Sequence, residues 1–389
     1  MSRYHSYLAS ASAIIKTYQG AEPFVHFGRK FFAGNKKFGS RDRKIIAAIC
    51  YSYFRAFHLF RDEPLEQRIL NSVFLCETAA NAFLLELDPV LHEKIELPVR
   101  EKIKFLEKDI EAIFPGISEL SDSLNKEEFA YSFLRQPLLY LRLRPGREKA
   151  VFKKLNDAQL PFDQPANDCI ALQNATSLDT ILKINREVVV QDFNSQRVFD
   201  FLTDECSLPG REGKIKAWDC CAASGGKSIL LYDRTGGKVE LTVSDIRKNI
   251  LHNLQERLHA AGVAVYKTLV ADLVKGKPGD IDDLFDLVIC DVPCTGSGTW
   301  SRTPEQLAFF KTYKIADYAK KQITIAGNAQ ELVKEGGLFF YITCSVFQKE
   351  NEEIVAALQK THVLQLLHQQ YFEGYDMRAD TLFVAVFRK

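Results

Sequence analysis

The feature that most constrains the fold is an alternation of short apolar strands with helical segments after about residue 206. Neighbouring parallel strands need a crossover helix between them, so this rhythm is typical of a parallel sheet with helices on both faces. One connecting segment, 247–262, has the apolar spacing of a helix and ends at Gly262, a residue suited to a helix C-terminus. The expected strands are 214–222, 238–245, 263–272, 285–292 and 336–345, with a last strand at 381–389.

The residues before this alternation have a different character. A chain of 389 residues is too long for one ordinary domain. Up to about residue 125 the apolar residues recur at spacings of three and four, which predicts a helical bundle. Strands at 138–143, 169–172 and 187–193, with a Pro-Gly turn and a basic helix, then predict a small α+β module. We therefore expect three domains, at 1–125, 126–205 and 206–389.

Two segments carry the strongest helical pattern in the predicted bundle. Residues 42–60 and 64–87 each predict one continuous helix. Asp42, with Ser40 just before it, is placed to cap the first of these helices after a turn at Gly39. The predicted core of the bundle includes Phe54, Phe57 and Phe60.

A formal net charge of +1 hides two clusters of basic residues. A basic face suits a phosphate backbone, so the clusters favour an RNA track on the two modules, which we expect to bind RNA. A solvated helix surface is the alternative that charge alone leaves open. The first cluster contains Arg3, Lys16, Arg29, Lys30, Lys36, Lys37, Arg41, Arg43, Lys44 and Arg55, and the second contains Arg142, Arg144, Arg147, Lys149, Lys153 and Lys154.

The nine cysteines form an odd set without a C-x-x-C pair. This pattern argues against a disulfide framework and against a zinc module, so we expect no metal. The first 20 residues lack the unbroken apolar core of a signal peptide, and no later apolar run is long enough to span a bilayer. We expect a cytoplasmic protein with no membrane contact, although the scarcity of acids near the start leaves a mitochondrial presequence open.

The loop "DCCAASGGKS" (219–228) leaves the first strand and opens a helix, where sheets of this kind bind a ligand. A P-loop needs glycine five residues before Gly226, and that position is Cys221. A dinucleotide fingerprint needs G-x-G-x-x-G, and only Gly225 and Gly226 are present. The loop therefore suits a ligand that approaches the backbone closely without a polyphosphate.

S-adenosylmethionine is such a ligand, because its amino-acid end can lie on this turn while its ribose needs a carboxylate after the second strand. Asp245 stands there, and Asp272 ends the third strand, where it can meet the adenine amino group. A helix cap is the simpler reading of any lone aspartate. Counting Asp219, however, three acids end consecutive strands, which favours the cofactor.

Three motifs together resemble a known family. "DCCAASGGKS" (219–228), "CDVPCTGSGTW" (290–300) and "YITCS" (341–345) with "ENEE" (350–353) are similar to the cofactor loop, the Pro-Cys motif and the Thr-Cys-Ser motif of the RNA cytosine carbon-5 methyltransferases of the Nol/Nop/Sun (RsmB-like) family. Segments 188–198, 302–305 and 382–389 also fall where that family has similar sequences, and 38–55 resembles the NusB-like helical domain of some members.

The resemblance implies a fold, a cofactor and a substrate. We expect an α/β, Rossmann-like class I S-adenosylmethionine-dependent methyltransferase with a mostly parallel seven-stranded sheet, preceded by the all-α bundle and the α+β module. The expected partner is RNA, ribosomal RNA before tRNA, and the expected state is a monomer. The implied cofactor-binding residues are Cys221, Ala222, Ala223, Ser224, Gly225, Gly226, Lys227, Asp245, Arg247, Asp272 and Asp291.

The resemblance also assigns catalytic roles to Cys344, Cys294 and Asp291. Carbon 5 of cytosine is a weak nucleophile, so a thiolate must first add to carbon 6, and a base must later remove the proton on carbon 5. By resemblance Cys344 is the nucleophile, Cys294 assists proton removal and release, and Asp291 hydrogen-bonds the cytosine edge. Lys227 is expected to orient the base or the methionine end. A helix near Lys349 is a candidate for lowering the pKa of the nucleophile.

Buried packing is the better guess for an isolated strand-end cysteine, and we retain it for Cys220, Cys221 and Cys290. Two other functions stay open. In a DNA cytosine methyltransferase, Cys294 would itself be the nucleophile and Cys344 superfluous. In a non-catalytic RNA-binding assembly factor the cofactor fold would be degenerate. Two segments depart from the family pattern: Ser224 stands where the family loop usually has proline, and "YITCSV" (341–346) stands where "YSTCSL" is commoner.

Overall fold

The computed structural model describes residues 2–202, 213–263, 266–279, 281, 283–361 and 363–389. The chain forms two compact units, one of Met1–Gln136 with Thr299–Thr312 and the other of Pro137–Gly298 with Tyr313–Lys389. The predicted boundary at 205 and 206, and Cys206 with it, lie outside the described residues. The three predicted domains therefore stay a prediction. In the part of the chain that is described, no helix is both long enough and apolar enough to cross a bilayer.

The first unit is helical, and its longest helix, α3, begins differently from the prediction. Gly39 is the N-cap, and Asp42 is the third residue of the helix, where its carboxylate accepts a hydrogen bond from Gly39 N at 3.0 Å. The carboxylate thus completes a capping box from inside the first turn, so the assignment of Asp42 as the cap was wrong in position. The helices of this unit are α1 (Arg3–Thr17), α2 (Phe24–Gly34), α3 (Ser40–Arg55), α4 (Leu65–Cys76), α5 (Ala82–Leu87), α6 (Pro89–Glu93), α7 (Val99–Phe105), α8 (Lys126–Ser132) and α12 (Pro304–Phe309), with 3-10 turns at Ile110–Ile113 and Ile117–Glu119.

The predicted single helix over 64–87 is two helices, α4 and α5. The break lies where Asn81 accepts hydrogen bonds from Phe83 N and Leu84 N and so starts a new helix. The asparagine cap thus starts a new helix although Ala79 and Ala80 before it favour helix. The predicted core is confirmed at Phe54 and Phe60, each 1% exposed, whereas Phe57 is only partly buried.

The helical unit also contains a segment from the predicted catalytic region, residues 299–312. Trp300 is 2% exposed, and its ring centroid lies 5.6 Å from that of Phe114. On α12, Glu305 accepts a hydrogen bond from Phe24 N at 3.1 Å. The sequence did not predict that residues 299–312 belong to the first unit. The apolar pattern of so short a segment does not identify the surface against which it packs.

In the second unit, the α+β module is a four-stranded antiparallel sheet of order β2-β3-β1-β4 with one helix. The apolar side chains of β1, β3 and α9 form its core. Three of its strands were predicted, and the exposed β2 was not, since it has no apolar pattern. The elements are β1 (Leu139–Leu143), α9 (Glu148–Asp157), β2 (Asp163–Ala166), β3 (Cys169–Leu172) and β4 (Val188–Val190).

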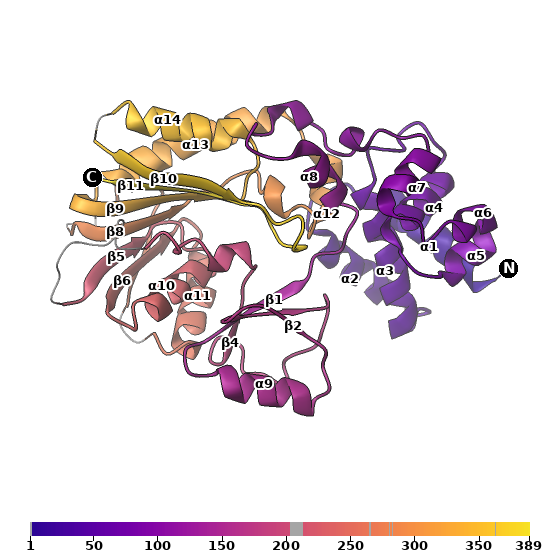
Figure 1. The fold of residues 1–389 in the computed structure, drawn as a ribbon, viewed down its shortest axis with the longest axis horizontal. Coiled ribbons are helices and arrows are strands. Elements are labelled where there is room, and N and C mark those ends of the chain that lie inside the picture. Colours follow the sequence, from indigo (N-terminus) through magenta and orange to yellow (C-terminus); the bar gives the residue numbers. More distant parts are fainter. Residues whose placement is uncertain (1, 203–212, 264–265, 280, 282, 362) are drawn as a thin grey trace. The chain divides into compact units, whose positions relative to one another are not determined.

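The rest of the second unit is a seven-stranded sheet of order β10-β11-β9-β8-β5-β6-β7. Strands β5 to β9 pair in parallel, and β10 and β11 are antiparallel. Helices α10 and α11 cover one face and α13 and α14 the other (Figure 1). The elements are β5 (Ile215–Asp219), α10 (Gly226–Arg234), β6 (Val239–Asp245), α11 (Lys248–Ala260), β7 (Tyr266–Val270), β8 (Phe285–Asp291), α13 (Tyr313–Gln330), β9 (Val333–Thr343), α14 (Glu352–Gln359), β10 (Gln365–Phe372) and β11 (Leu382–Arg388), with 3-10 turns at Asn194–Gln196, Ser297–Thr299 and Gln348–Glu350.

This arrangement confirms the predicted fold class, a mostly parallel seven-stranded sheet preceded by a helical region and a small module. Cys220, Cys294 and Cys344 all follow parallel strands, so they lie at the carboxyl edge, where such sheets bind ligands. Helix α11 ends as predicted, with Gly262 at φ +72°.

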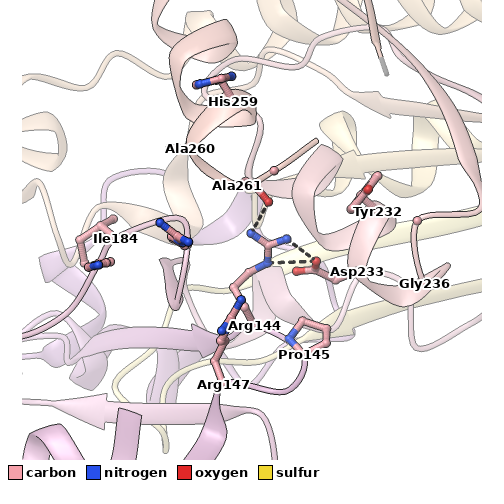
Figure 2. A pocket seen from close by; sticks show the side chains of 14 residues that line it. Arg144, Pro145, Arg147, Ile184, Tyr232, Asp233, Gly236, His259, Ala260 and Ala261 are labelled. Atoms are coloured by element: carbon pink, nitrogen blue, oxygen red, sulfur yellow. Dashed lines mark hydrogen bonds and ion pairs between the residues drawn. The ribbon is translucent and has the colours of Figure 1, made fainter. Parts of the chain in front are cut away.

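A buried ion-pair cluster joins the module to the seven-stranded sheet. Arg142 and Arg144, on and just after β1, are 2% and 8% exposed, and both pair with Asp233 near the end of α10. Figure 2 shows the pair of Arg144 with Asp233. Arg144 also donates to the backbone oxygens of Asn185 and Ala261. The expectation that Arg142 and Arg144 belong to an exposed RNA track is therefore wrong.

A similar correction applies to Arg55 of the first basic cluster. Its side chain is 3% exposed and donates to the backbone oxygen of Phe133 and to Gln136 Oε1. Arg29, Lys36, Lys37, Arg41, Arg43 and Lys44 of that cluster are exposed.

Removal of the shared carboxylate tests the importance of this cluster. We expect Asp233→Ala to lower the free energy of unfolding by about 3–5 kcal/mol, because two buried guanidinium groups lose their counterion. Denaturant unfolding measures the loss, and Asp157→Ala, an exposed aspartate of the same module, is the control. A loss within 0.5 kcal/mol of the control would contradict the role given to Asp233.

Candidate active site

The loop between β5 and α10 is shaped by one glycine. Gly225 has φ +80°, and a Cβ there would lie 2.2 Å from Leu254 Cδ1 of α11. Only glycine satisfies both the left-handed conformation and this close approach. Ala223 has φ +46°, which an L side chain seldom adopts. The loop thus holds its backbone in an unusual conformation at the ligand-binding edge of the sheet.

The loop is tied to the end of β6. Ala222 N donates to Ser244 O at 2.9 Å, and Ala223 N donates to Asp245 Oδ2 at 3.2 Å. Although burial acts against ionisation, hydrogen bonds from Arg247 hold the pKa of Asp245 below its ordinary value. Asp245 is therefore a carboxylate fixed beside the loop.

Ser224, the departure from the family loop, has a partner that sequence reasoning missed. Arg257 of α11 donates to Ser224 O at 3.0 Å and to Ser224 Oγ at 2.8 Å. The same guanidinium donates to Asn185 Oδ1 at 2.8 Å and to Val190 O at 3.3 Å, both in the module. One side chain thereby links the loop, α11 and the module.

Asp219, at the end of β5, is a buried carboxylate with one free oxygen. Its Oδ2 accepts a hydrogen bond from Ser228 Oγ at 2.6 Å, whereas its Oδ1 has no donor among the described residues. Burial raises the pKa of Asp219 to about 7. A buried acceptor without a donor is costly, so Asp219 suits a ligand that brings its own N–H group.

Lys227 and Asp291 form an ion pair at the same edge. Lys227 Nζ lies 2.6 Å from Asp291 Oδ2. Burial opposes the charged amine, yet the Asp291 carboxylate, with smaller contributions from Cys344 and Asp219, raises the pKa of Lys227 above its ordinary value. Lys227 is therefore a cation close to the Cys344 thiol. The helix predicted near Lys349 begins instead at Glu352.

The two cysteines of the predicted pair meet. Strands β8 and β9 are adjacent and parallel, with Asp291 opposite Ile342, and the chain just beyond them brings Cys294 Sγ to 3.5 Å from Cys344 Sγ. Both side chains are partly buried. The hydrogen bond with Cys344, reinforced by burial, raises the pKa of Cys294 well above its ordinary value. Cys294 is thus held as a thiol that can donate to the Cys344 sulfur.

A buried carboxylate, Glu350, positions the loops of both cysteines. It accepts hydrogen bonds from Thr295 N at 2.9 Å, from Thr295 Oγ1 and from Ser345 Oγ. Gln322 Nε2 of α13 donates to the same carboxylate at 2.9 Å and to Pro293 O at 3.1 Å. Glu350 therefore joins the residue after Cys294 to the residue after Cys344.

Two further contacts fix the Cys344 backbone. Gly298 N donates to Cys344 O at 2.9 Å, and a Cβ on Gly298 would lie 2.0 Å from Thr381 O. Asn351 accepts a hydrogen bond from Thr343 Oγ1 at 2.6 Å and donates to Ser345 O at 2.9 Å. The sequence offered one signal for this scaffold, the "ENEE" motif, to which no positional role had been assigned.

The remaining predicted site residues have local partners. Asp272 follows the outer strand β7, where its Oδ1 accepts a hydrogen bond from Val274 N at 3.1 Å and its Oδ2 lies 3.5 Å from Lys275 Nζ. Gly226 begins α10, and Cys221 is partly buried. Cys220 and Cys290 are fully buried, in agreement with the packing interpretation.

Residues 207–385, which include both cysteines and the loop, match the family described as 16S rRNA methyltransferase RsmB/F. This segment is an RsmB/F family domain. A probable ribosomal RNA small subunit methyltransferase B of Bacillus subtilis is 30% identical over 51% of the chain and 42% of the relative. The human tRNA (cytosine(72)-C(5))-methyltransferase NSUN6 is 29% identical over 50% of the chain and 41% of the relative. The chain therefore spans about two fifths of the length of these relatives.

A solved structure extends the similarity of fold beyond the RsmB/F domain. The crystal structure of PH0851 covers 97% of this chain and 97% of its own, with a TM-score of 0.71 and 18% sequence identity. At this identity the likeness concerns the fold alone. It includes the helical region and the small module as well as the seven-stranded sheet.

Glu350 gives the most direct structural test of the site. We expect Glu350→Ala to lower the free energy of unfolding by about 3 kcal/mol or more, because several buried donors lose their acceptor. Glu353→Ala is the control, since Glu353 is exposed and lies three residues further along the chain, in the first turn of α14. If denaturant unfolding gives equal stabilities for the two variants, Glu350 does not hold the cysteine loops.

Proposed function

We propose that this protein transfers the methyl group of S-adenosylmethionine to carbon 5 of a cytosine in structured RNA. The observation that carries the proposal is the 3.5 Å separation of Cys294 Sγ and Cys344 Sγ at the carboxyl edge of the sheet. Two neighbouring thiols suit a reaction in which one group adds to the pyrimidine and a second group assists release of the product. The RsmB/F family match supports the same reaction class.

The loop and the strand ends fit S-adenosylmethionine. When bound, the cofactor supplies an electrophilic methyl group. The donor-free Asp219 Oδ1 fits the ammonium group of its methionine part, and the ionised Asp245 fits its ribose hydroxyls. Asp272, on the outer strand, is proposed to meet the adenine amino group. The other proposed contacts are the loop residues Cys221, Ala222, Ala223, Ser224, Gly225, Gly226 and Lys227, together with Arg247 and Asp291.

Cys344 is proposed as the nucleophile. Its thiolate sulfur forms a bond to carbon 6 of cytosine, and the electron pair of the 5,6 double bond becomes available at carbon 5. Carbon 5 would then bond the methyl carbon while the bond from that carbon to the sulfonium sulfur breaks, with S-adenosylhomocysteine as the leaving group. Asp291, which is paired with Lys227, is proposed to hold the ring nitrogen and amino edge. The Lys227 cation and the Cys294 thiol both lie near the Cys344 sulfur.

Cys294 is proposed to act after methyl transfer. The hydrogen bond with Cys344 is the main cause of the raised pKa of Cys294. After attack, the Cys344 sulfur is bonded to carbon 6 and Cys294 is the remaining thiol of the pair; we propose that it gives its proton to water before it acts. Cys294 can then take the proton from carbon 5, the carbon 6 to sulfur bond breaks, and the double bond returns with Cys344 as the thiolate.

Separate replacement of the two cysteines tests these roles. We expect Cys344→Ala to lower the rate of methyl transfer by roughly 1000-fold or more, because carbon 5 is never activated. We expect Cys294→Ala to accumulate a covalent adduct between enzyme and RNA, visible on denaturing gels, because the adduct cannot be resolved. Cys290→Ala, at a buried cysteine outside the pair, is the control and should behave as the parent protein.

The reverse pattern would identify a different mechanism. A stable adduct in Cys344→Ala, and none in Cys294→Ala, would make Cys294 the nucleophile, as in the DNA cytosine methyltransferases. Absence of methyl transfer and of S-adenosylmethionine binding at millimolar concentration would favour a non-catalytic RNA-binding factor.

Ribosomal RNA is the substrate that we propose. The Bacillus subtilis relative is named for ribosomal RNA and the human relative for tRNA, so both classes occur at similar identity. The helical unit carries exposed basic side chains on and between α2 and α3, and we propose that it is a NusB-like RNA-binding region. Bisulfite sequencing of total RNA from cells with and without this protein decides between the two RNAs.

Arg257 gives a separate test of cofactor binding. We expect Arg257→Ala to weaken S-adenosylmethionine binding about tenfold, or about 1.4 kcal/mol, because the loop loses its tie at Ser224. His252→Ala, at an exposed position of the same helix, is the control. Calorimetry measures both dissociation constants, and an unchanged value for Arg257→Ala would show that the loop holds its conformation without this contact.

A further inference from the structure

A pocket of about 830 Å³ lies between the α+β module and the seven-stranded sheet. Figure 2 shows its two walls: the turn after β1 with Arg144, Pro145 and Arg147, and the ends of α10 and α11 with Tyr232 and His259. Ligand pockets commonly have volumes of about 300–1,000 Å³, so this pocket has the size of a ligand site rather than of a packing defect. The lining also includes Lys183 and Arg186, from the loop before β4.

The charge of the lining is strongly positive. Its ionised side chains are Arg144, Arg147, Lys183 and Arg186 on one side and the single carboxylate of Asp233 on the other. The carboxyl ends of two helices add partial negative charges of about −0.5 each. These do not cancel the surplus of cations, so the pocket attracts an anion.

The cations that line the pocket differ in whether they are already paired with groups of the protein. Arg144 is committed to Asp233 and to two backbone oxygens. Arg147 and Arg186 are exposed, and their side chains have no ion pair or hydrogen bond among the described residues. Lys183 is also exposed, although its ammonium lies near Glu187, a carboxylate already paired with Lys154. Arg147 and Arg186 therefore have unused donors at the mouth of a pocket whose floor is fixed.

The pocket lies at the opposite edge of the sheet from the cysteine pair. Helices α10 and α11 begin at the carboxyl edge, beside the cofactor loop, and the pocket is lined by their far ends. The 13 residues of α11 span roughly 20 Å at 1.5 Å per residue. The pocket is thus distinct from the proposed active site.

We propose that this pocket binds the phosphodiester backbone of the substrate RNA, away from the modified cytosine. Arginine guanidinium groups suit phosphate because they present several N–H donors in a plane. A contact of this kind positions an RNA without reading its sequence. The proposal rests on the proposed function, since it requires RNA as the substrate, and it explains why the module is joined rigidly to the sheet through Asp233.

Charge reversal at the mouth of the pocket tests the proposal. The test variant combines Arg147→Glu with Arg186→Glu. The matched control combines Lys320→Glu on α13 with Lys360→Glu at the end of α14, which makes the same charge change at exposed positions outside both basic clusters. We expect the test variant to weaken binding of the substrate RNA at least tenfold and to reduce the slope of log K against log salt concentration by about 1 to 2, since each lost phosphate contact contributes about 0.7 to 0.9. The control should change the dissociation constant less than threefold.

Two further measurements separate the possible failures. Both variants should bind S-adenosylmethionine as the parent protein does, which shows that the fold and the cofactor loop are intact. If the parent protein methylates RNA and the test and control variants bind RNA equally well, the pocket proposal is wrong while the proposed function stands. If the parent protein neither binds nor methylates RNA, the proposed function is wrong, and the pocket proposal that rests on it is wrong as well.

A calorimetric titration distinguishes RNA from a small anion as the ligand of the pocket. Inorganic phosphate and tripolyphosphate are titrated into each protein by calorimetry. Tight binding of either anion to the parent protein and its loss in the test variant, with unchanged RNA affinity, would identify a small-anion site and overturn the assignment to RNA. Weak binding of both anions with a large loss of RNA affinity supports it.

Discussion

The arrangement of the candidate active site depends on one buried carboxylate, that of Glu350. The carboxylate accepts hydrogen bonds from the residues that follow Cys294 and Cys344 in the chain, and from Gln322 of α13. Burial raises the pKa of Glu350, although its hydrogen-bond donors oppose that effect. A buried acid with several donors is a strong local constraint because every donor would be left unsatisfied without it. The proximity of the two sulfur atoms is thus a property of the scaffold around them.

The parallel sheet and its ligand-binding edge could be predicted because they follow from local pattern. Strands 285–292 and 336–345 are almost uniformly apolar, as strands buried on both faces must be. Their carboxyl ends place Cys294 and Cys344 side by side, which sequence distance alone would not suggest. By contrast, β10 (Gln365–Phe372) was missed, since "QLLHQQYF" has too many polar residues for a buried-strand pattern.

The interactions that were missed join residues far apart in the chain. Asp233 neutralises Arg142 and Arg144 about 90 positions away, which turns two expected RNA contacts into internal structure. Arg257 holds Ser224 across 33 positions. Sequence pattern identifies the charge of such residues but not their partners, because pairing is decided only when the elements pack. The "ENEE" motif shows the same limit, since the motif was recognised without the contacts that give Glu350 its role.

The central claim is that Cys344 forms the bond to the pyrimidine. The most direct test is mass spectrometry of the peptide that carries RNA after reaction with S-adenosylmethionine and a substrate containing 5-fluorocytosine, in which the missing proton on carbon 5 prevents release of the adduct. The account predicts that the RNA is attached to the peptide containing Cys344. Attachment to the peptide containing Cys294, or methylation of the normal substrate without any trapped adduct, would contradict it.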